Sequence, residues 1–342
     1  LQTHWGRLAT FFFLYVSEGV PHGFTSIAIA AQMRRQEVSP ESIATFIGLL
    51  YLPWSWKWVA GPVVDVVYSD RLGRRRGWIV GCQLLMVITL LGITPFDFRT
   101  QMAIVGWMVL SHNVFAATQD VAIDSLAVST LRENERGRGN GFMFAGQYFG
   151  IALGGGAAVF VYGLFGFGAT LAYISGLLLF NLMFVLLYVH DPEADPDAVP
   201  PAHMFKKLLA SLVVFVREVY ESFWKSGRGP MVGVLFALLP TGAIALAYAT
   251  LGTIQVDYGL NENQIAELRI YNTFASAVGC IACGLLGDRF GPKKVVAASY
   301  ALTTLPTLLL AFQIAEVGLL SVTLGSFYGL IIAHGFLYGM AF

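Results

Sequence analysis

Charged residues are scarce in this 342-residue sequence: Asp, Glu, Lys and Arg make up only 12% of it, whereas soluble domains carry about 25%. The 21 basic and 21 acidic residues balance, so no excess of positive charge points to a nucleic-acid partner. Hydrophobic residues instead form 56% of the chain and gather in runs long enough to cross the ~30 Å hydrocarbon core of a bilayer. The composition excludes an ordinary soluble domain and predicts an all-α membrane protein in contact with lipid.

Cysteine is also scarce, and Cys82, Cys280 and Cys283 all lie in apolar runs. The last two have C-x-x-C spacing, but no further polar ligand accompanies them, which favours small packing residues over a metal or redox site. We therefore expect no metal and no cofactor. The phosphate-binding pattern G-x-x-x-x-G-K-[ST] does not occur in the sequence either, so direct coupling to ATP is not expected.

The apolar runs predict ten membrane spans. Their expected ranges are 8–31, 43–67, 77–93, 102–126, 141–165, 170–189, 231–254, 265–286, 295–311 and 317–342. The first run is too long for the core of a cleaved signal peptide, so we interpret it as a retained span. Lys and Arg gather on the side that would be cytoplasmic if the N-terminus is cytoplasmic, and this asymmetry predicts the topology.

A short basic turn occurs twice at equivalent places between apolar runs. Residues 70–76 read DRLGRRR, and residues 284–294 read GLLGDRFGPKK. Such a repeat predicts two pseudo-symmetric helix bundles, as in many secondary transporters. Because the repeated pattern begins again at the seventh span, we expect a six-plus-six plan whose last two helices are absent from this chain.

The expected domains follow from this plan. Residues 1–190 would form an N-terminal six-helix bundle and residues 230–342 an incomplete C-terminal bundle of four helices. Between them, residues 191–229 begin with an Asp- and Pro-rich linker that cannot be helical. Apolar residues then recur at helical spacing with charged residues on the other faces, which predicts an amphipathic helix on the cytoplasmic surface.

The second basic turn resembles the G-x-x-x-D-R-x-G-R-[KR] loop of the major facilitator superfamily, with Pro292 as its departure. In the first copy, Gly61 and Asp65 begin the pattern, but its basic end arrives several residues late. A longer first turn ending in L-G-R-R-R-G-W, here residues 72–78, is similar to the turn of AmpG-type muropeptide permeases. The segments around Lys57 and Asp120 resemble the same branch, which also contains acetyl-CoA transporters and siderophore permeases.

This resemblance covers most of the first half, whereas the second half resembles only the superfamily. It implies the major facilitator fold and a small-molecule substrate moved by alternating access. The branch implies import of a muropeptide, N-acetylglucosaminyl-anhydro-N-acetylmuramyl peptide, across the bacterial inner membrane, with acetyl-CoA or siderophore uptake as alternatives.

We expect the residues of both turns to form a cytoplasmic gate, because aspartates are stabilised at helix N-termini and arginines pair with carboxylates. Asp124, near the cytoplasmic end of the fourth span, is expected to pair with the arginines of the first turn. The alternative is that the basic residues only mark the cytoplasmic side. The expected gate consists of Asp65, Asp70, Arg71, Gly73, Arg74, Arg75, Arg76, Asp124, Gly284, Asp288, Arg289, Gly291, Lys293 and Lys294.

Ionisable side chains near the middle of a bilayer cost about 2.5–3.5 kcal/mol on insertion scales, so each one needs a reason. Glu18 and His22 lie one turn apart on the first span, beside the helix break that Pro21 introduces. They predict a proton or substrate site, with a plain helix contact as the alternative. Lys57 in the second span is a counter-ion for Glu18 or an anion ligand, unless it snorkels to the headgroups.

Asp120 and Asp124 also lie one turn apart, on the fourth span. Two carboxylates this close repel each other when both are ionised, so Asp120 is the expected proton carrier. Arg269 begins the eighth span and is either an anion ligand or an interfacial anchor. The expected substrate- or proton-binding set is Glu18, His22, Lys57, Asn113, Gln119, Asp120 and Arg269.

These observations predict a monomeric secondary active transporter, coupled to protons, rather than an enzyme. A membrane-embedded enzyme acting on lipid or cell-wall intermediates would need a nucleophile, metal cluster or acid/base pair at the interface, and the spacing of the residues suggests none. A sensor would need a soluble output domain, which residues 1–342 do not contain.

Overall fold

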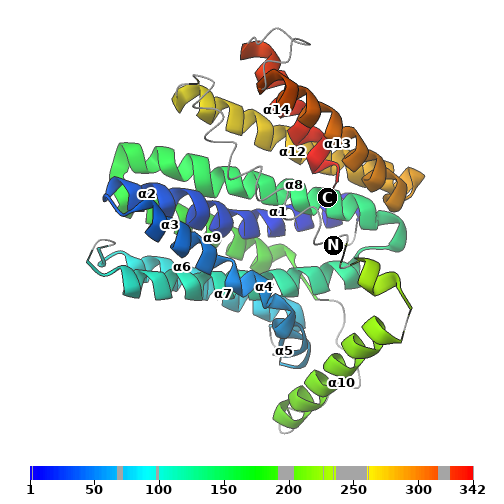
Figure 1. Cartoon of the computed structure of the whole chain (residues 1–342). Helices are drawn as coiled ribbons and strands as arrows, with labels where there is room; N and C mark the ends of the chain where they lie inside the picture. The colour runs from blue at the N-terminus through cyan, green and yellow to red at the C-terminus, as the bar shows by residue number, and fades with distance from the viewer. Residues whose placement is uncertain are drawn as a thin grey trace. The chain divides into compact units, whose positions relative to one another are not determined.

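The computed structural model describes residues 1, 3–67, 72–97, 100–191, 204–225, 227–233, 235, 260, 262–314 and 324–341. The secondary-structure elements in these ranges are all helices, as the composition predicts (Figure 1). Contacts divide the chain into two compact units, one formed by Leu1–Pro196 with Ile270–Phe342 and the other by Asp197–Arg269. The expected domain boundaries at 190 and 230 stay predictions.

The first unit begins with a long helix and a broken one. The helix α1 (His4–Gly23) continues through the π-helical segment η1 (Phe24–Ala28) into α2 (Ile29–Arg35). The predicted second span is instead divided into α3 (Pro40–Leu50), α4 (Leu52–Ser55), the 3₁₀ segment η2 (Lys57–Val59) and α5 (Ala60–Val66). Proline at the start of α4 favours this break, because it cannot donate a backbone hydrogen bond.

The next four predicted spans all lie in helical segments of this unit. These segments are α6 (Arg74–Ile93), α7 (Met102–Thr130), the 3₁₀ segment η3 (Glu133–Glu135), α8 (Arg136–Ile151), the π-helical segment η4 (Ala152–Ala157) and α9 (Ala158–Tyr188). Within α9, Gly166 has φ +82°, a conformation that suits glycine and interrupts the helix. This kink separates the fifth and sixth predicted spans.

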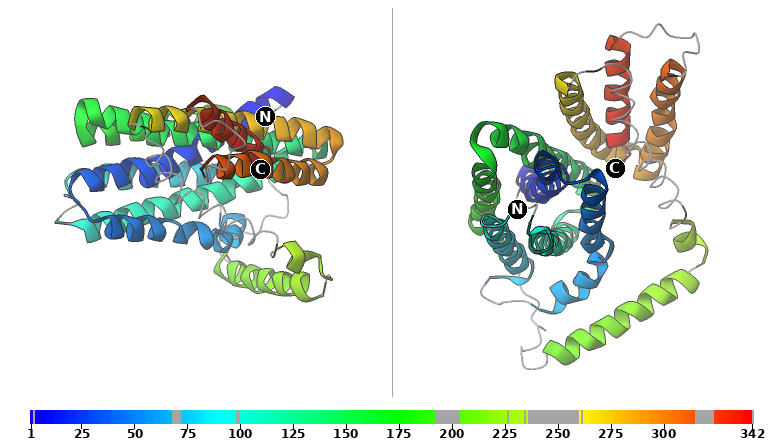
Figure 2. Two further views of the ribbon diagram at one scale, coloured as in Figure 1. Left: turned by 45° about the horizontal axis from the view of Figure 1, so that its top comes forward. Right: turned by 60° about the vertical axis from the view of Figure 1, so that its left-hand side comes forward.

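Helix α1 lies among the other helices of residues 1–188 and packs against α7, α8 and α9 (Figure 2, right panel). Its contact with α8 is the closest, because glycines of both helices meet backbone across the interface. A Cβ atom on Gly154 or Gly150 would overlap the carbonyl oxygen of Val20 or Val16, and one on Gly19 would overlap that of Gln147. Glycine thus allows two backbones to touch, a packing device typical of membrane helices.

Later helices follow the predicted spans with gaps. The second unit contains α10 (Met204–Trp224), in agreement with the amphipathic pattern, and α12 (Glu262–Phe290) begins there. The remaining helices are α13 (Pro292–Ile314) and α14 (Leu324–Gly339). The linker at 192–203 lies outside the described residues, as does most of the predicted span 231–254.

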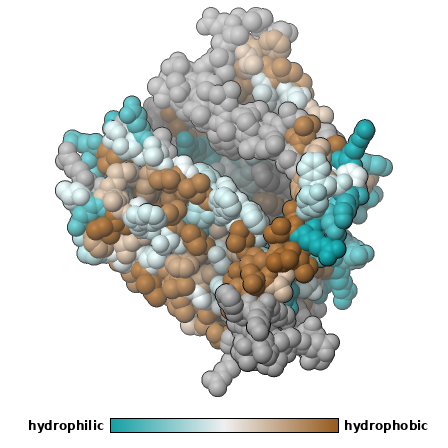
Figure 3. Space-filling view, turned by 60° about the horizontal axis from the view of Figure 1, so that its bottom comes forward, coloured by the Kyte–Doolittle hydropathy of each residue, from teal (hydrophilic) through white to brown (hydrophobic). Residues whose placement is uncertain are grey.

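Four stretches of the described residues are long and apolar enough to cross a membrane: Arg74–Ile93, Glu133–Tyr188, Glu267–Phe290 and Pro292–Gln313. The second of them contains two predicted spans. Large apolar side chains such as Ile88, Phe160 and Phe180 are exposed on these helices. Hydrophobic residues cover much of the middle of the face in Figure 3, with hydrophilic ones towards its edges. Such a surface suits contact with lipid.

Candidate functional site

A cavity of about 410 Å³ opens between four parts of the first unit: α1, the broken second span, α7 and α8. It brings together four residues of the expected binding set, Glu18, His22, Lys57 and Asp120, from helices distant in sequence. The full lining consists of Tyr15, Glu18, His22, Tyr51, Trp54, Lys57, Asp120, Asp124, Asn140, Phe144 and Gln147.

Lys57 forms the electrostatic centre of this cavity. Its Nζ lies 2.5 Å from Oδ2 of Asp120 and 3.9 Å from Oδ2 of Asp124. The two carboxylates differ in access, because the side chain of Asp120 is 3% exposed whereas those of Asp124 and Lys57 are 43% and 39% exposed. The side chain of Lys57 is therefore the accessible partner of this ion pair, and the carboxylate of Asp120 is the buried one.

Glu18 provides a third carboxyl group, which is 3% exposed. Gln147 donates a 2.6 Å hydrogen bond from Nε2 to its Oε1. The other oxygen, Oε2, is buried without a hydrogen-bond partner in the described part of the chain. A buried carboxyl oxygen normally finds a donor, so this atom is suited to carry a proton or to receive a ligand.

Local structure explains these positions. Lys57 begins the 3₁₀ segment η2, where the second span departs from regular α-helix. Irregular backbone within a membrane occurs where it lines a cavity or is covered by protein. Glu18 and Gln147 each adjoin a glycine of the α1–α8 interface, and the close approach of the two backbones brings their side chains together.

Aromatic rings border the charged groups on two sides. The ring of His22 lies edge-on to Tyr51 and Trp54, with centroid distances of 5.9 and 6.5 Å. On the other side, Tyr15 lies edge-on to Phe144 at 5.9 Å. The cavity therefore combines a charged centre with flat apolar surfaces, which suits a solute that has both polar and ring-shaped parts.

Three residues of the expected binding set lie outside this cavity lining. Asn113 is buried, and its Nδ2 donates to the carbonyl oxygen of Val109 within α7. Gln119 is also buried and joins α7 to α1 through a 3.0 Å bond from Nε2 to Ser17 Oγ. Arg269 is exposed on α12, in the second compact unit.

Asp124 lies elsewhere than the sequence suggests. We expected it to pair with the arginines of the first basic turn, but Tyr15 donates a hydrogen bond from its hydroxyl to Asp124 Oδ1. Together with Lys57, this contact places the carboxylate in the cavity. The nearby arginine Arg75 instead donates from Nε to the hydroxyl of Ser125, the next residue along α7.

The first basic turn surrounds the N-terminus of α6. Gly73 precedes this helix with φ +87°, and a Cβ atom there would overlap the carboxylate of Asp191. Asp191 accepts backbone hydrogen bonds from Arg75 and Arg76, so it caps α6 from beyond the end of α9. Negative charge is stabilised at this end of a helix.

The arginine side chains of this turn bind neighbouring helix ends. Arg74 donates to the carbonyl oxygen of Asp65, and Arg76 donates to that of Leu186. Asp70 and Arg71 lie outside the described residues.

The second basic turn has a similar geometry. The carboxylate of Asp288 accepts hydrogen bonds from the backbone N–H groups of Gly137 and Arg138, at 2.9 and 3.2 Å, and so caps α8. Arg138 adds an ion pair through Nε at 2.8 Å. These contacts fit the expectation that the aspartate interacts with a helix N-terminus.

The remaining residues of the second turn range from buried to exposed. Gly284 is buried, and a Cβ atom there would meet the backbone of Gly137. The guanidinium of Arg289 lies over the ring of Phe290, while Lys293 and Lys294 are exposed. Gly291, with φ +92°, allows the turn between α12 and α13.

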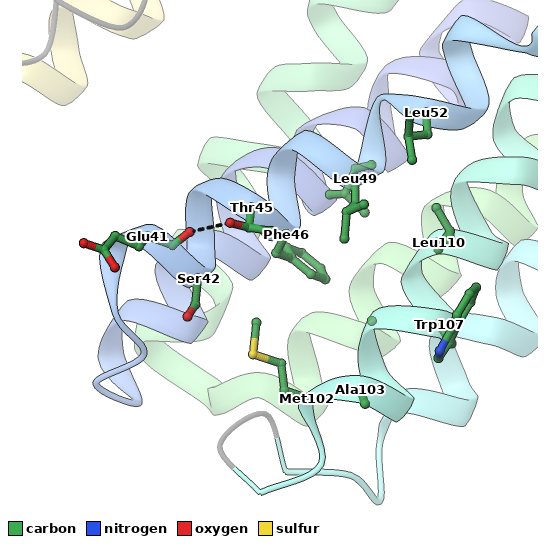
Figure 4. Close-up of a pocket in the computed structure, with 12 residues that line it drawn as sticks. Glu41, Ser42, Thr45, Phe46, Leu49, Leu52, Met102, Ala103, Trp107 and Leu110 are labelled. Carbon is green, nitrogen blue, oxygen red and sulfur yellow. Dashed lines mark hydrogen bonds between the residues drawn. The ribbon is translucent and has the colours of Figure 1, made fainter.

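A second pocket, of about 730 Å³, lies between α3 and α7 (Figure 4). Its lining is mainly apolar, with Leu49, Trp107 and Leu110 along it, and Glu41 and Ser42 lie at one end. None of the expected binding residues lines it, whereas four of them line the smaller, charged cavity.

Apolar helices around a charged central cavity are typical of membrane transporters. The chain belongs to the major facilitator superfamily, because the model of that family matches residues 8–342. It is therefore an all-helical membrane protein of this superfamily.

Two relatives whose names describe a permease or transporter are similar to most of this chain. The anhydromuropeptide permease of Escherichia coli K12 is 24% identical over 288 residues, which cover 83% of this chain and 56% of that protein. A putative transporter of Rickettsia felis, AmpG 4, is 21% identical and covers 84% and 69%.

Two further comparisons concern length and fold. An uncharacterized protein of Haemophilus influenzae is 25% identical over 52% of this chain and 42% of its own length, so the chain spans about half the length of such relatives. The crystal structure of the human organic anion transporter MFSD10 (TETRAN) matches all of this chain and 84% of its own chain, with a TM-score of 0.66 and 13% identity. This likeness concerns the fold.

Proposed function

We propose that the protein is a proton-coupled importer that moves an anionic solute by alternating access, with the cavity around Lys57 as its binding site. The observation that carries this proposal is the cluster of three carboxyl groups around one lysine ammonium. If all of them were ionised, the group would hold two excess negative charges, with the carboxylates of Glu18 and Asp120 both buried. This is costly, and protonation of a carboxyl group relieves it.

The best candidate for the solute is a muropeptide, N-acetylglucosaminyl-anhydro-N-acetylmuramyl peptide. The similarity to the Escherichia coli anhydromuropeptide permease supports it, as do the aromatic surfaces and hydrogen-bonding groups of the cavity. Sugar rings stack on aromatic side chains and bind carboxylates and amides. Acetyl-CoA and siderophores remain alternatives, since each also combines ring structures with anionic or polar groups.

In this proposal, the two capped helix starts form the gate. Asp191 at α6 and Asp288 at α8 hold the basic turns against neighbouring helix ends, and release of these contacts would accompany the change in access. The bias of basic residues supports a cytoplasmic position of both turns and of the N-terminus, in a bacterial inner membrane. We further propose that the chain acts as a monomer.

The test is uptake of the muropeptide into proteoliposomes with an imposed pH gradient. We expect accumulation when the outside is acidic and a fall to the level of simple equilibration, about tenfold lower or more, in Asp120→Asn. Asp97→Asn is the matched control, since Asp97 is exposed in the loop before α7. Uptake that does not depend on the pH gradient would exclude proton coupling. Unchanged accumulation by Asp120→Asn would show that Asp120 is not the coupling residue.

A further inference from the structure

The positions of Lys57 and Asp120 within the cavity suggest how substrate and proton are linked. Lys57 is the only lysine or arginine among the described residues that line the cavity. It is also accessible, whereas its partner Asp120 is buried. An anionic solute that enters the cavity therefore meets the accessible ammonium before it can meet the buried carboxylate.

The ammonium of Lys57 is already paired with Asp120. A carboxylate or phosphate of the solute would therefore compete with Asp120 for it. The side chain of Lys57 is long and flexible, and η2 is a short 3₁₀ segment with no buried residue. Lys57 can therefore turn away from Asp120 within the cavity without disturbing a packed helix face. Asp120, on the continuous helix α7, keeps its place.

Once released by Lys57, Asp120 would be a buried charge beside other carboxyl groups. The titratable or polar groups that face this region are Tyr15, Glu18 and His22 from α1, Tyr51 and Trp54 from the broken second span, Asp124 from α7 itself, and Asn140 and Gln147 from α8. None of them carries a permanent positive charge. A buried, unpaired carboxylate in such surroundings is strongly disfavoured relative to its protonated form.

We propose that Lys57 exchanges Asp120 for an anionic group of the solute, and that Asp120 takes up one proton as it is released. Binding of each anion would thus be accompanied by the uptake of one proton. Recognition of the solute's charge and binding of the driving ion would then be linked at a single pair of residues. This inference rests on the proposed function and goes beyond it by assigning charge selection to Lys57.

Calorimetric binding to the purified full chain tests this exchange. The probe is the muropeptide named above, with its carboxyl groups either free or converted to carboxamides. Titrations in two buffers of different ionisation enthalpy give the number of protons taken up per molecule bound. For the unchanged protein we expect the free acid to bind about tenfold or more tightly than the amide, with uptake of about one proton.

Three variants, at two residues, separate the parts of the exchange. Lys57→Met should bind acid and amide with similar affinity, whereas Lys57→Arg should keep the preference for the acid. Asp120→Asn should keep that preference but take up almost no proton. Lys225→Met is the matched control, because Lys225 follows α10, where it is exposed and paired with Glu221.

The outcomes that overturn the exchange are distinct from those that overturn the function. Equal binding of acid and amide by the unchanged protein would overturn charge selection, and proton uptake that persists in Asp120→Asn would overturn the role of Asp120. Either result leaves proton-driven uptake standing. Absence of binding by both forms would overturn the exchange together with the muropeptide assignment.

Discussion

Two sides of the charged cavity are built in opposite ways. We call α1 with α8, together with the π-helical segments η1 and η4 that continue them, the packed wall. The four segments α3, α4, η2 and α5 are the broken wall. In the packed wall, glycines bring two helix backbones into contact, and most of α1 from Leu14 to Gly23 is buried. In the broken wall, neither α4 nor η2 contains a buried residue.

This difference agrees with the separate roles that we propose for the charged residues. Glu18 and Gln147 are held by the packed wall and meet in a fixed geometry. Lys57 stands on the broken wall, where short segments and exposed side chains allow movement. A binding site that must form and release contacts benefits from one firm side and one adjustable side.

The largest effect is expected from a side chain placed within the packed wall. Gly154→Val should lower the free energy of unfolding by about 3 kcal/mol, because its Cβ would overlap the carbonyl oxygen of Val20. Thermal unfolding of the purified protein measures this loss.

Gly156→Val is the matched control for this change. It lies two residues away in the same π-helical segment, and a Cβ there would have no neighbour within 4 Å. Equal losses for both variants would show that the close approach of α1 and α8 does not determine stability.

A smaller effect is expected from the polar contact in the packed wall. Gln147→Leu should cost about 1–2 kcal/mol, because Glu18 loses its hydrogen-bond donor while remaining buried. The pH optimum of uptake should change with it, which a purely structural role would not cause. Gln147→Glu tests the donor directly, since it restores shape but not a permanent N–H. A Leu variant with unchanged stability and uptake would contradict this role.

The smallest effect on stability is expected in the broken wall. Pro53→Ala should change the free energy of unfolding by less than about 1 kcal/mol, since α4 is short and has no buried residue. Uptake should fall severalfold, because a more continuous helix would carry Lys57 away from Asp120. Trp56→Ala, at an exposed position, should affect neither. A Pro53 variant that is as active as the unchanged protein would show that the break is not needed.

The sequence predicts this fold well wherever one helix is long and apolar. Residues 102–126, 265–286 and 295–311 all lie within continuous helices, and the kink at Gly166 separates two predicted spans. The divisions of the second span were not predicted, although Pro53 provides a local signal for them. The two π-helical segments were also missed, since a shift from i→i+4 to i→i+5 bonding leaves no clear mark in composition.

The candidate site was predicted only in part from the sequence. Burial cost alone identified Glu18, Lys57 and Asp120 as residues that need partners. Their actual partners depend on which helices adjoin, which a single sequence does not give. Gln147 could have been found from its place between Gly146 and Gly150, on the face that suits close packing. The cap formed by Asp191 could not, because it joins residues more than 100 positions apart.

The two π-helical segments have a consequence for the register of the packed wall. Each widened turn contains one residue more than an α-helical turn, so it rotates everything beyond it by about 100° around the helix axis. The segments η1 and η4 contact each other, and the rotations therefore occur at the same level on both helices. Side chains of α1 and α8 that pack together before the π-helical segments are therefore followed by side chains that pack together after them. Loss of a single residue from η1 or η4 alone would put half of the interface out of phase with its partner.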